Sequence, residues 1–159
     1  MVTPVIKGQV RVQDSRMQVP FTPVPKPGPR ILLIDDDPVF IAVMQRWAAL
    51  EKVQLETFTS LDEMGFIGLF SNYDVAILDY DLGYTTGIEI ARCTDALLHD
   101  MPIVIVSAKD RSLECIDAPA CVKAVLQKSK GYSHILSVAT KLCRSSSEAR
   151  LKELRRMVN

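Results

Sequence analysis

Acidic residues directly follow two short apolar runs in this sequence. The run Ile31–Ile34 is followed by Asp35 and Asp36, and the run Val75–Leu78 is followed by Asp79. A carboxylate at the end of a buried run loses hydration and needs a compensating partner. These positions are therefore the first candidates for chemistry.

Two further apolar runs end in groups that suit an anion. Ile103–Val106 is followed by the hydroxyl of Ser107, and Ala124–Gln127 is followed by the ammonium of Lys128. In a parallel sheet the carboxyl ends of the strands share one edge, where ligands bind. If these runs are parallel strands, the carboxylates, the hydroxyl and the ammonium converge there.

Such a cluster predicts phosphoryl transfer. Three neighbouring carboxylates repel one another unless a cation joins them, and ligation by oxygen alone suits Mg²⁺, which shares phosphate oxygens. Lys128 and Ser107 supply a point charge and a donor for an anion. A metal, a carboxylate nucleophile and an anion site together indicate transfer of a phosphoryl group to an aspartate, here Asp79.

Apolar runs alternate with segments of helical periodicity, which indicates a parallel sheet covered on both faces. The predicted strands are Ile31–Ile34, Val53–Phe58, Val75–Leu78, Ile103–Val106 and Ala124–Gln127. The predicted helices are Pro38–Leu50 after the N-cap Asp37, Ser60–Phe70, Gly87–Leu98 and Ser133–Cys143, with a weaker segment at Arg111–Ala118.

Both ends of the chain differ from this pattern. Residues 1–29 end in a proline-rich stretch, which predicts an extended tail. Residues 30–143 form the predicted domain, and residues 144–159 predict a short helical tail, with the helix Glu148–Met157 following a polar break at Ser145–Ser147.

Composition narrows the class of protein. The chain has 159 residues with no net charge, so it offers no electrostatic argument for direct nucleic-acid binding, and no apolar run predicts membrane insertion. Its four cysteines show no metal-ligand spacing and predict reduced thiols, which favours a cytoplasmic protein.

Four segments together resemble the receiver domains of two-component response regulators. They are ILLIDDDP, VAILDYDLGYTTG, PIVIVSA and AVLQKS, in the family's order and at similar intervals over about Arg30 to Cys143. The resemblance implies a flavodoxin-like, doubly wound α/β fold with a five-stranded parallel sheet in the order 2-1-3-4-5. It also implies that Asp79 is the phosphoacceptor.

The resemblance assigns the remaining site residues by position. Asp35 and Asp36 bind Mg²⁺ together with Asp79 and the backbone carbonyl of Asp81, Ser107 is the switch hydroxyl, and Lys128 contacts the phosphoryl group. The implied donor is a sensor histidine kinase or a phosphotransfer protein. With no recognisable output domain after Cys143, we expect a single-domain regulator that contacts a downstream protein target and is not an enzyme; homodimerisation is left open.

Two other classes of protein share part of this pattern. Ser129 stands where the family has proline after the lysine, and Val125 stands where it has an aromatic residue, as expected of a degenerate receiver that acts without phosphorylation. The Asp79-x-Asp81 pattern also resembles haloacid-dehalogenase-like phosphatases, but those enzymes need acidic metal ligands after the lysine. This chain has no aspartate beyond Asp117, and its acidic pair Asp35 and Asp36 comes before Asp79 instead.

The positions of Asp81 and Lys109 predict a contact over the acceptor. Each lies two residues beyond a strand-end group, Asp79 and Ser107 respectively. We expect a salt bridge between them that slows loss of the phosphoryl group.

Overall fold

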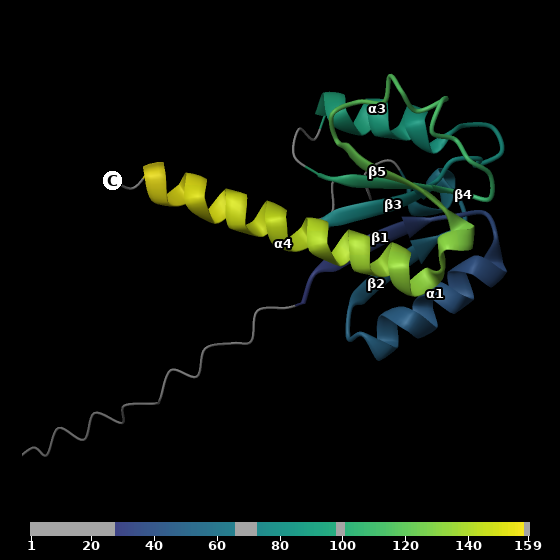
Figure 1. Ribbon diagram of the computed structural model, residues 1–159, viewed down its shortest axis with the longest axis horizontal. Coiled ribbons are helices and arrows are strands. Elements are labelled where there is room, and N and C mark those ends of the chain that lie inside the picture. The colour runs from purple at the N-terminus through teal and green to yellow at the C-terminus, as the bar shows by residue number, and fades with distance from the viewer. Residues whose placement is uncertain (1–27, 66–72, 98–100, 158–159) are drawn as a thin grey trace, which may run out of the picture.

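The computed structural model of the protein describes residues 28–65, 73–97 and 101–157 (Figure 1). Its strands are β1 (Arg30–Ile34), β2 (Gln54–Phe58), β3 (Val75–Asp79), β4 (Ile103–Ser107) and β5 (Val122–Gln127). Its helices are α1 (Pro38–Leu50), α2 (Leu61–Met64), α3 (Gly87–Leu97), the short 3-10 helix η2 (Lys128–Lys130) and α4 (Tyr132–Met157).

The strands form one sheet in the order β2-β1-β3-β4-β5, and every neighbouring pair is parallel. Helices α1 and α4 cover one face and α3 covers the other, as Figure 1 shows. The predicted fold class, a doubly wound five-stranded sheet in the order 2-1-3-4-5, is confirmed.

The continuous apolar runs arise because the central strands are buried on both faces. In β1, Ile31 and Leu33 pack with α1 and α4, while Leu32 and Ile34 pack with the residues of α3. Successive strand side chains point to opposite faces, so a strand covered on both faces needs apolar residues throughout. Each fully buried Leu or Ile side chain contributes about 1.5–3 kcal/mol.

Helix α1 begins as its sequence predicts. Asp37 is the N-cap, and its carboxylate accepts a hydrogen bond from the Val39 N–H at 2.8 Å. Pro38 occupies the first turn, where its missing N–H costs no helical hydrogen bond. This start places the helix directly after the acidic residues that follow β1.

The predicted helix at Arg111–Ala118 is wrong, because this segment forms hydrogen-bonded turns. The carboxylate of Asp110 accepts hydrogen bonds from the backbone N–H and the hydroxyl of Ser112 at 3.0 and 2.5 Å, and this local turn competes with helix formation. Pro119 then disfavours a helical conformation for Ala118. The segment 108–121 therefore joins β4 to β5 without a regular helix.

The break predicted at Ser145–Ser147 is also wrong, because α4 runs unbroken from Tyr132 to Met157. The Ser145 hydroxyl donates to the carbonyl of Lys141 at 3.1 Å, so this serine bonds within the helix and does not cap a new one. Among the α4 residues of known burial, Cys143 is the last buried one.

Other boundaries differ less. Helix α2 ends at Met64 before Gly65, whose φ of 71° favours glycine, and the rest of the predicted helix Ser60–Phe70 lies outside the described residues. The predicted tail lies outside them too, except for Gly28 and Pro29. In the described part of the chain, no helix combines the length and apolarity required to span a bilayer.

Leu33→Ala should lower the free energy of unfolding by about 2–5 kcal/mol, because it opens a cavity at a fully buried site. Urea denaturation followed by circular dichroism measures this change. The matched control is Leu50→Ala, at a side chain that is 74% exposed, which should stay within about 0.5 kcal/mol of the parent protein. Equal losses in both variants would contradict the described core.

Candidate functional site

The carboxyl ends of the strands bring the predicted site residues to one edge of the sheet. β3 ends in Asp79, which pairs with Val106 of β4, and Ser107 pairs with Gln127, the residue before Lys128. Asp35 directly follows β1, the other neighbour of β3. The side chains of Asp35, Asp79 and Ser107 are buried, whereas Asp36 is exposed at the rim.

Lys128 joins the two buried carboxylates. Its Nζ donates to Oδ1 of Asp35 at 2.9 Å, lies 2.8 Å from Oδ2 of the same residue, and lies 3.1 Å from Oδ1 of Asp79. The ammonium also sits 4.5 Å from the ring centroid of Phe40, a core residue of α1. Sequence analysis did not predict this contact between the lysine and Phe40.

Burial and mutual charge shift the pKa values of Asp35, Asp79 and Lys128. Burial, opposed by the Lys128 hydrogen bond and reinforced by the charge of Asp79, raises the pKa of Asp35 to about 6. Burial also raises the pKa of Asp79, against the lowering effect of Lys128. For Lys128, burial lowers the pKa, but the hydrogen bond and charge of Asp35 and the charge of Asp79 outweigh it and raise the pKa above its ordinary value.

The donor set fits a hard divalent cation. Asp35, Asp36 and Asp79 each offer a carboxylate oxygen, and these oxygens all lie within 4.8 Å of one another. Oδ2 of Asp35 is buried, and its close partner among the described side chains is the Lys128 ammonium at 2.8 Å. Oxygen ligands with room for waters are those that Mg²⁺ takes in proteins, so the residues present suit the predicted metal.

Gly87 allows the end of β3 and helix α3 to meet closely. A Cβ added at this position would collide with the backbone carbonyl of Asp79. The N–H of Gly87 donates to the carbonyl of Tyr80 at 3.0 Å, which anchors the first turn of α3 to the loop after Asp79. Thr86 and Glu89 cap this turn reciprocally, through hydrogen bonds of 3.2 and 2.8 Å.

Ser107 ends the strand next to β3, and its hydroxyl oxygen already accepts a hydrogen bond. Its Oγ accepts the backbone N–H of Lys109 at 3.2 Å, which leaves the hydroxyl hydrogen to donate elsewhere. The residue is 1% exposed. The hydroxyl is therefore held at the same edge as Asp79.

The predicted salt bridge between Asp81 and Lys109 is wrong, because Asp81 pairs with Arg111. The guanidinium Nη2 lies 3.0 Å from Oδ2 and 3.3 Å from Oδ1 of Asp81. Sequence analysis missed Arg111 because it placed this residue in a helix. The Asp-x-Ser turn signal at Asp110–Ser112 was the available indication that the chain bends there.

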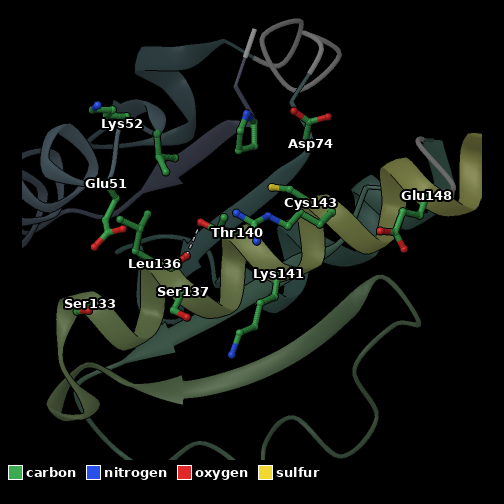
Figure 2. A pocket seen from close by; sticks show the side chains of 13 residues that line it. Glu51, Lys52, Asp74, Ser133, Leu136, Ser137, Thr140, Lys141, Cys143 and Glu148 are labelled. Atoms are coloured by element: carbon green, nitrogen blue, oxygen red, sulfur yellow. Dashed lines mark hydrogen bonds between the residues drawn. The ribbon is translucent and has the colours of Figure 1, made fainter. Parts of the chain in front are cut away.

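A cavity of about 770 Å³ lies away from this cluster (Figure 2). It lies between α4, which contributes Thr140 and Cys143, and residues next to the amino ends of the strands, among them Pro29, Val53 and Asp74. No predicted site residue lines it. The chemistry predicted from the sequence therefore belongs to the acidic cluster.

Comparison with known proteins identifies the family. The sequence profile of the response regulator receiver domain matches residues 31–137, so the chain belongs to this family. Members of the family accept a phosphoryl group, bind Mg²⁺ in an acidic pocket and interact with histidine kinases or phosphotransfer proteins. No curated protein sequence matches the chain.

Solved structures share the fold at low sequence identity. A CheY-like receiver domain protein of Methanospirillum hungatei is 18% identical, with a TM-score of 0.67 over 77% of this chain and 98% of its own. The response regulator TrrA of Thermotoga maritima, solved in complex with Mg²⁺ and BeF, is 22% identical, with a TM-score of 0.62 over 72% and 98%. A chain described as an adenylate cyclase of Rhodopirellula baltica is 17% identical, with a TM-score of 0.70 over 83% and 99%.

Without Mg²⁺, the contribution of Asp35 to stability should fall as the pH rises from about 4 to about 6. The ordinary pKa of an aspartate is 3.8 and that of Asp35 in the folded protein is about 6, so the folded state holds the proton more tightly over this window. The effect is of order 3 kcal/mol at most. Urea denaturation across this pH range should show Asp35→Asn gaining stability relative to the parent protein as the pH rises.

Saturating Mg²⁺ provides the control for this measurement. A cation that binds the ionised carboxylate should stabilise the parent protein at neutral pH and remove most of the gain of Asp35→Asn. Parallel stability curves for the two proteins without Mg²⁺ would contradict the electrostatic account of the pocket.

Proposed function

We propose that this chain accepts a phosphoryl group on Asp79 in a Mg²⁺-dependent reaction and signals through contacts with another protein. The observation that carries the proposal is the cluster of Asp35, Asp36 and Asp79 with Lys128 at one edge of the sheet. Its carboxylates outnumber its ammonium, which suits a divalent cation and a transferring phosphoryl group.

The step is a displacement at phosphorus. A carboxylate oxygen of Asp79 attacks the phosphorus of a phosphohistidine or an acyl phosphate, and the bond from phosphorus to the leaving nitrogen or oxygen breaks with its electron pair. When bound, Mg²⁺ supplies charge neutralisation for the phosphoryl oxygens. Asp35, Asp36 and Asp79, with the backbone carbonyl of Asp81, are the residues proposed to hold it.

Lys128 and Ser107 are proposed to bind the transferred group. Lys128 already lies 3.1 Å from an oxygen of Asp79, within reach of phosphoryl oxygens on that residue. The Ser107 hydroxyl hydrogen can donate to the same oxygens. The lysine acts as a point charge and the serine as a neutral donor.

The partners follow from this chemistry. The donor is a sensor histidine kinase or a phosphotransfer protein, and the output is contact with a downstream target protein rather than direct nucleic-acid binding. We place this exchange in the cytoplasm and assign the chain no classical enzymatic activity. Action as a single receiver domain, with the predicted limits 30–143, is part of the proposal.

Asp79→Asn should abolish phosphoryl uptake, because the amide cannot attack phosphorus. Incubation with acetyl phosphate and Mg²⁺, followed by intact-mass measurement, should show one added phosphoryl group in the parent protein and none in the variant. Chelation of Mg²⁺ should also prevent the addition. Asp117→Asn, at an exposed carboxylate outside the pocket, is the matched control and should label normally. Undiminished labelling of Asp79→Asn would refute the assignment.

Asp36→Ala should weaken Mg²⁺ binding at least about tenfold, since it removes a proposed direct ligand, whereas we expect Asp35 to act mainly through water. Titration calorimetry measures the affinity. In the metal-free protein the same substitution removes a like charge, so it should leave stability unchanged or raise it. An unaltered Mg²⁺ affinity would exclude Asp36 as a ligand.

A phosphorylation-independent interaction module is the second candidate. It is favoured by Ser129 and Val125 in place of the family's proline and aromatic residue, and by the turns of segment 108–121. Hydrogen exchange with and without beryllofluoride separates the two candidates. A change across residues 107–118 supports a phosphoryl-driven switch, and identical exchange with the analogue bound supports the module.

A further inference from the structure

Arg111 contacts three side chains, two of which lie in the loop after Asp79. Its Nη2 binds both carboxylate oxygens of Asp81, and its guanidinium lies 4.5 Å from the ring centroid of Tyr80. Its Nη1 binds Glu114 at 3.0 Å. The Arg111 side chain is 21% exposed although it lies in a turn segment.

The partners of Arg111 lie next to the acceptor in the sequence. Tyr80 and Asp81 are the two residues that directly follow Asp79, and one arginine holds the ring of the first and the carboxylate of the second. Arg111 itself follows Ser107 by four residues, in the segment after β4. We call this set of contacts the Arg111 clamp; it joins the loop after β3 to the segment after β4.

The contacts of the Arg111 clamp can break at a low free-energy cost. The Asp81 side chain is 60% exposed, and ion pairs open to water are weak and exchange readily. Segment 108–121 has few buried anchors, chiefly Cys115 and Cys121, while Leu113 and Ile116 are 81% and 72% exposed. Regions with little buried surface open at low free-energy cost.

We propose that Arg111 is a positioning residue that keeps the acceptor pocket closed and thereby limits the rates at which phosphoryl donors and hydrolytic water reach Asp79. This inference rests on the proposed function. The Asp79 side chain is only 7% exposed, so access to it requires movement of the surrounding loops. The clamp connects the loops that end β3 and β4, on either side of the Asp79–Ser107 edge.

A closed pocket affects entry and loss through the same opening. Arg111→Ala should therefore speed labelling by acetyl phosphate and hydrolysis of the labelled protein by a similar factor, of about three- to tenfold. The labelled fraction at steady state should change little, because both rates rise together. A purely structural defect would instead lower the labelled fraction and weaken Mg²⁺ binding.

The experiment measures labelling and decay rates by intact mass in a set of variants. Lys109→Ala is the matched control, because Lys109 lies in the same segment but makes no described ion pair with Asp81. Arg111→Lys should restore the rates only in part, since lysine keeps the charge but loses the planar two-pronged contact. The double variant Asp81→Asn/Arg111→Ala should be labelled and dephosphorylated no faster than Arg111→Ala alone, because the two substitutions remove the same contact.

The outcomes distinguish the two proposals. Rates in Arg111→Ala equal to those of the parent protein would overturn the clamp and leave the phosphoacceptor function intact. Labelling of neither protein would overturn the proposed function, and the clamp as a control on phosphoryl access with it.

Discussion

The candidate site is organised by an excess of negative charge at the edge of the sheet where the parallel strands end. Three carboxylates from the ends of β1 and β3 face one ammonium from the end of β5. Burial makes each charge costly, which is why the pKa of Asp35 rises to about 6 even with Lys128 in contact. The doubly wound topology supplies this arrangement, because parallel strands end at the same edge.

Lys128 must reach past β4 to make its contacts. In the sheet β4 stands between β5 and β3, and the residue at its end is the small Ser107. The lysine then bonds Asp35, which follows β1, and Asp79, which ends β3. One side chain thus joins the ends of three strands, and the Phe40 ring beneath its ammonium links this contact to the core of α1.

The strands and the strand-end residues were predictable because both depend on short-range pattern. A run such as Ile31–Ile34 is apolar at every position since both faces of β1 are covered, and the polar residue that ends it marks the edge. The continuity of α4 was not predictable. A run of serines is typical of a helix break, but a serine hydroxyl can also bond to the preceding turn of a helix, as Ser145 does. The partner of Asp81 was not predicted either, since the choice between Lys109 and Arg111 depends on the turns that follow Ser107.

The turns between β4 and β5 also determine how a change at the pocket can spread. A helix in this position would bury an apolar stripe and move as a rigid body, whereas segment 108–121 contacts the core through few side chains. Val125, half-buried in β5, packs against the same core cluster as Cys115. We therefore expect segment 108–121 to accommodate a displacement of Ser107 more easily than β5 does. The same segment carries the exposed side chains of Leu113 and Ile116, and Arg111 is the described side chain that connects it to the residues after Asp79.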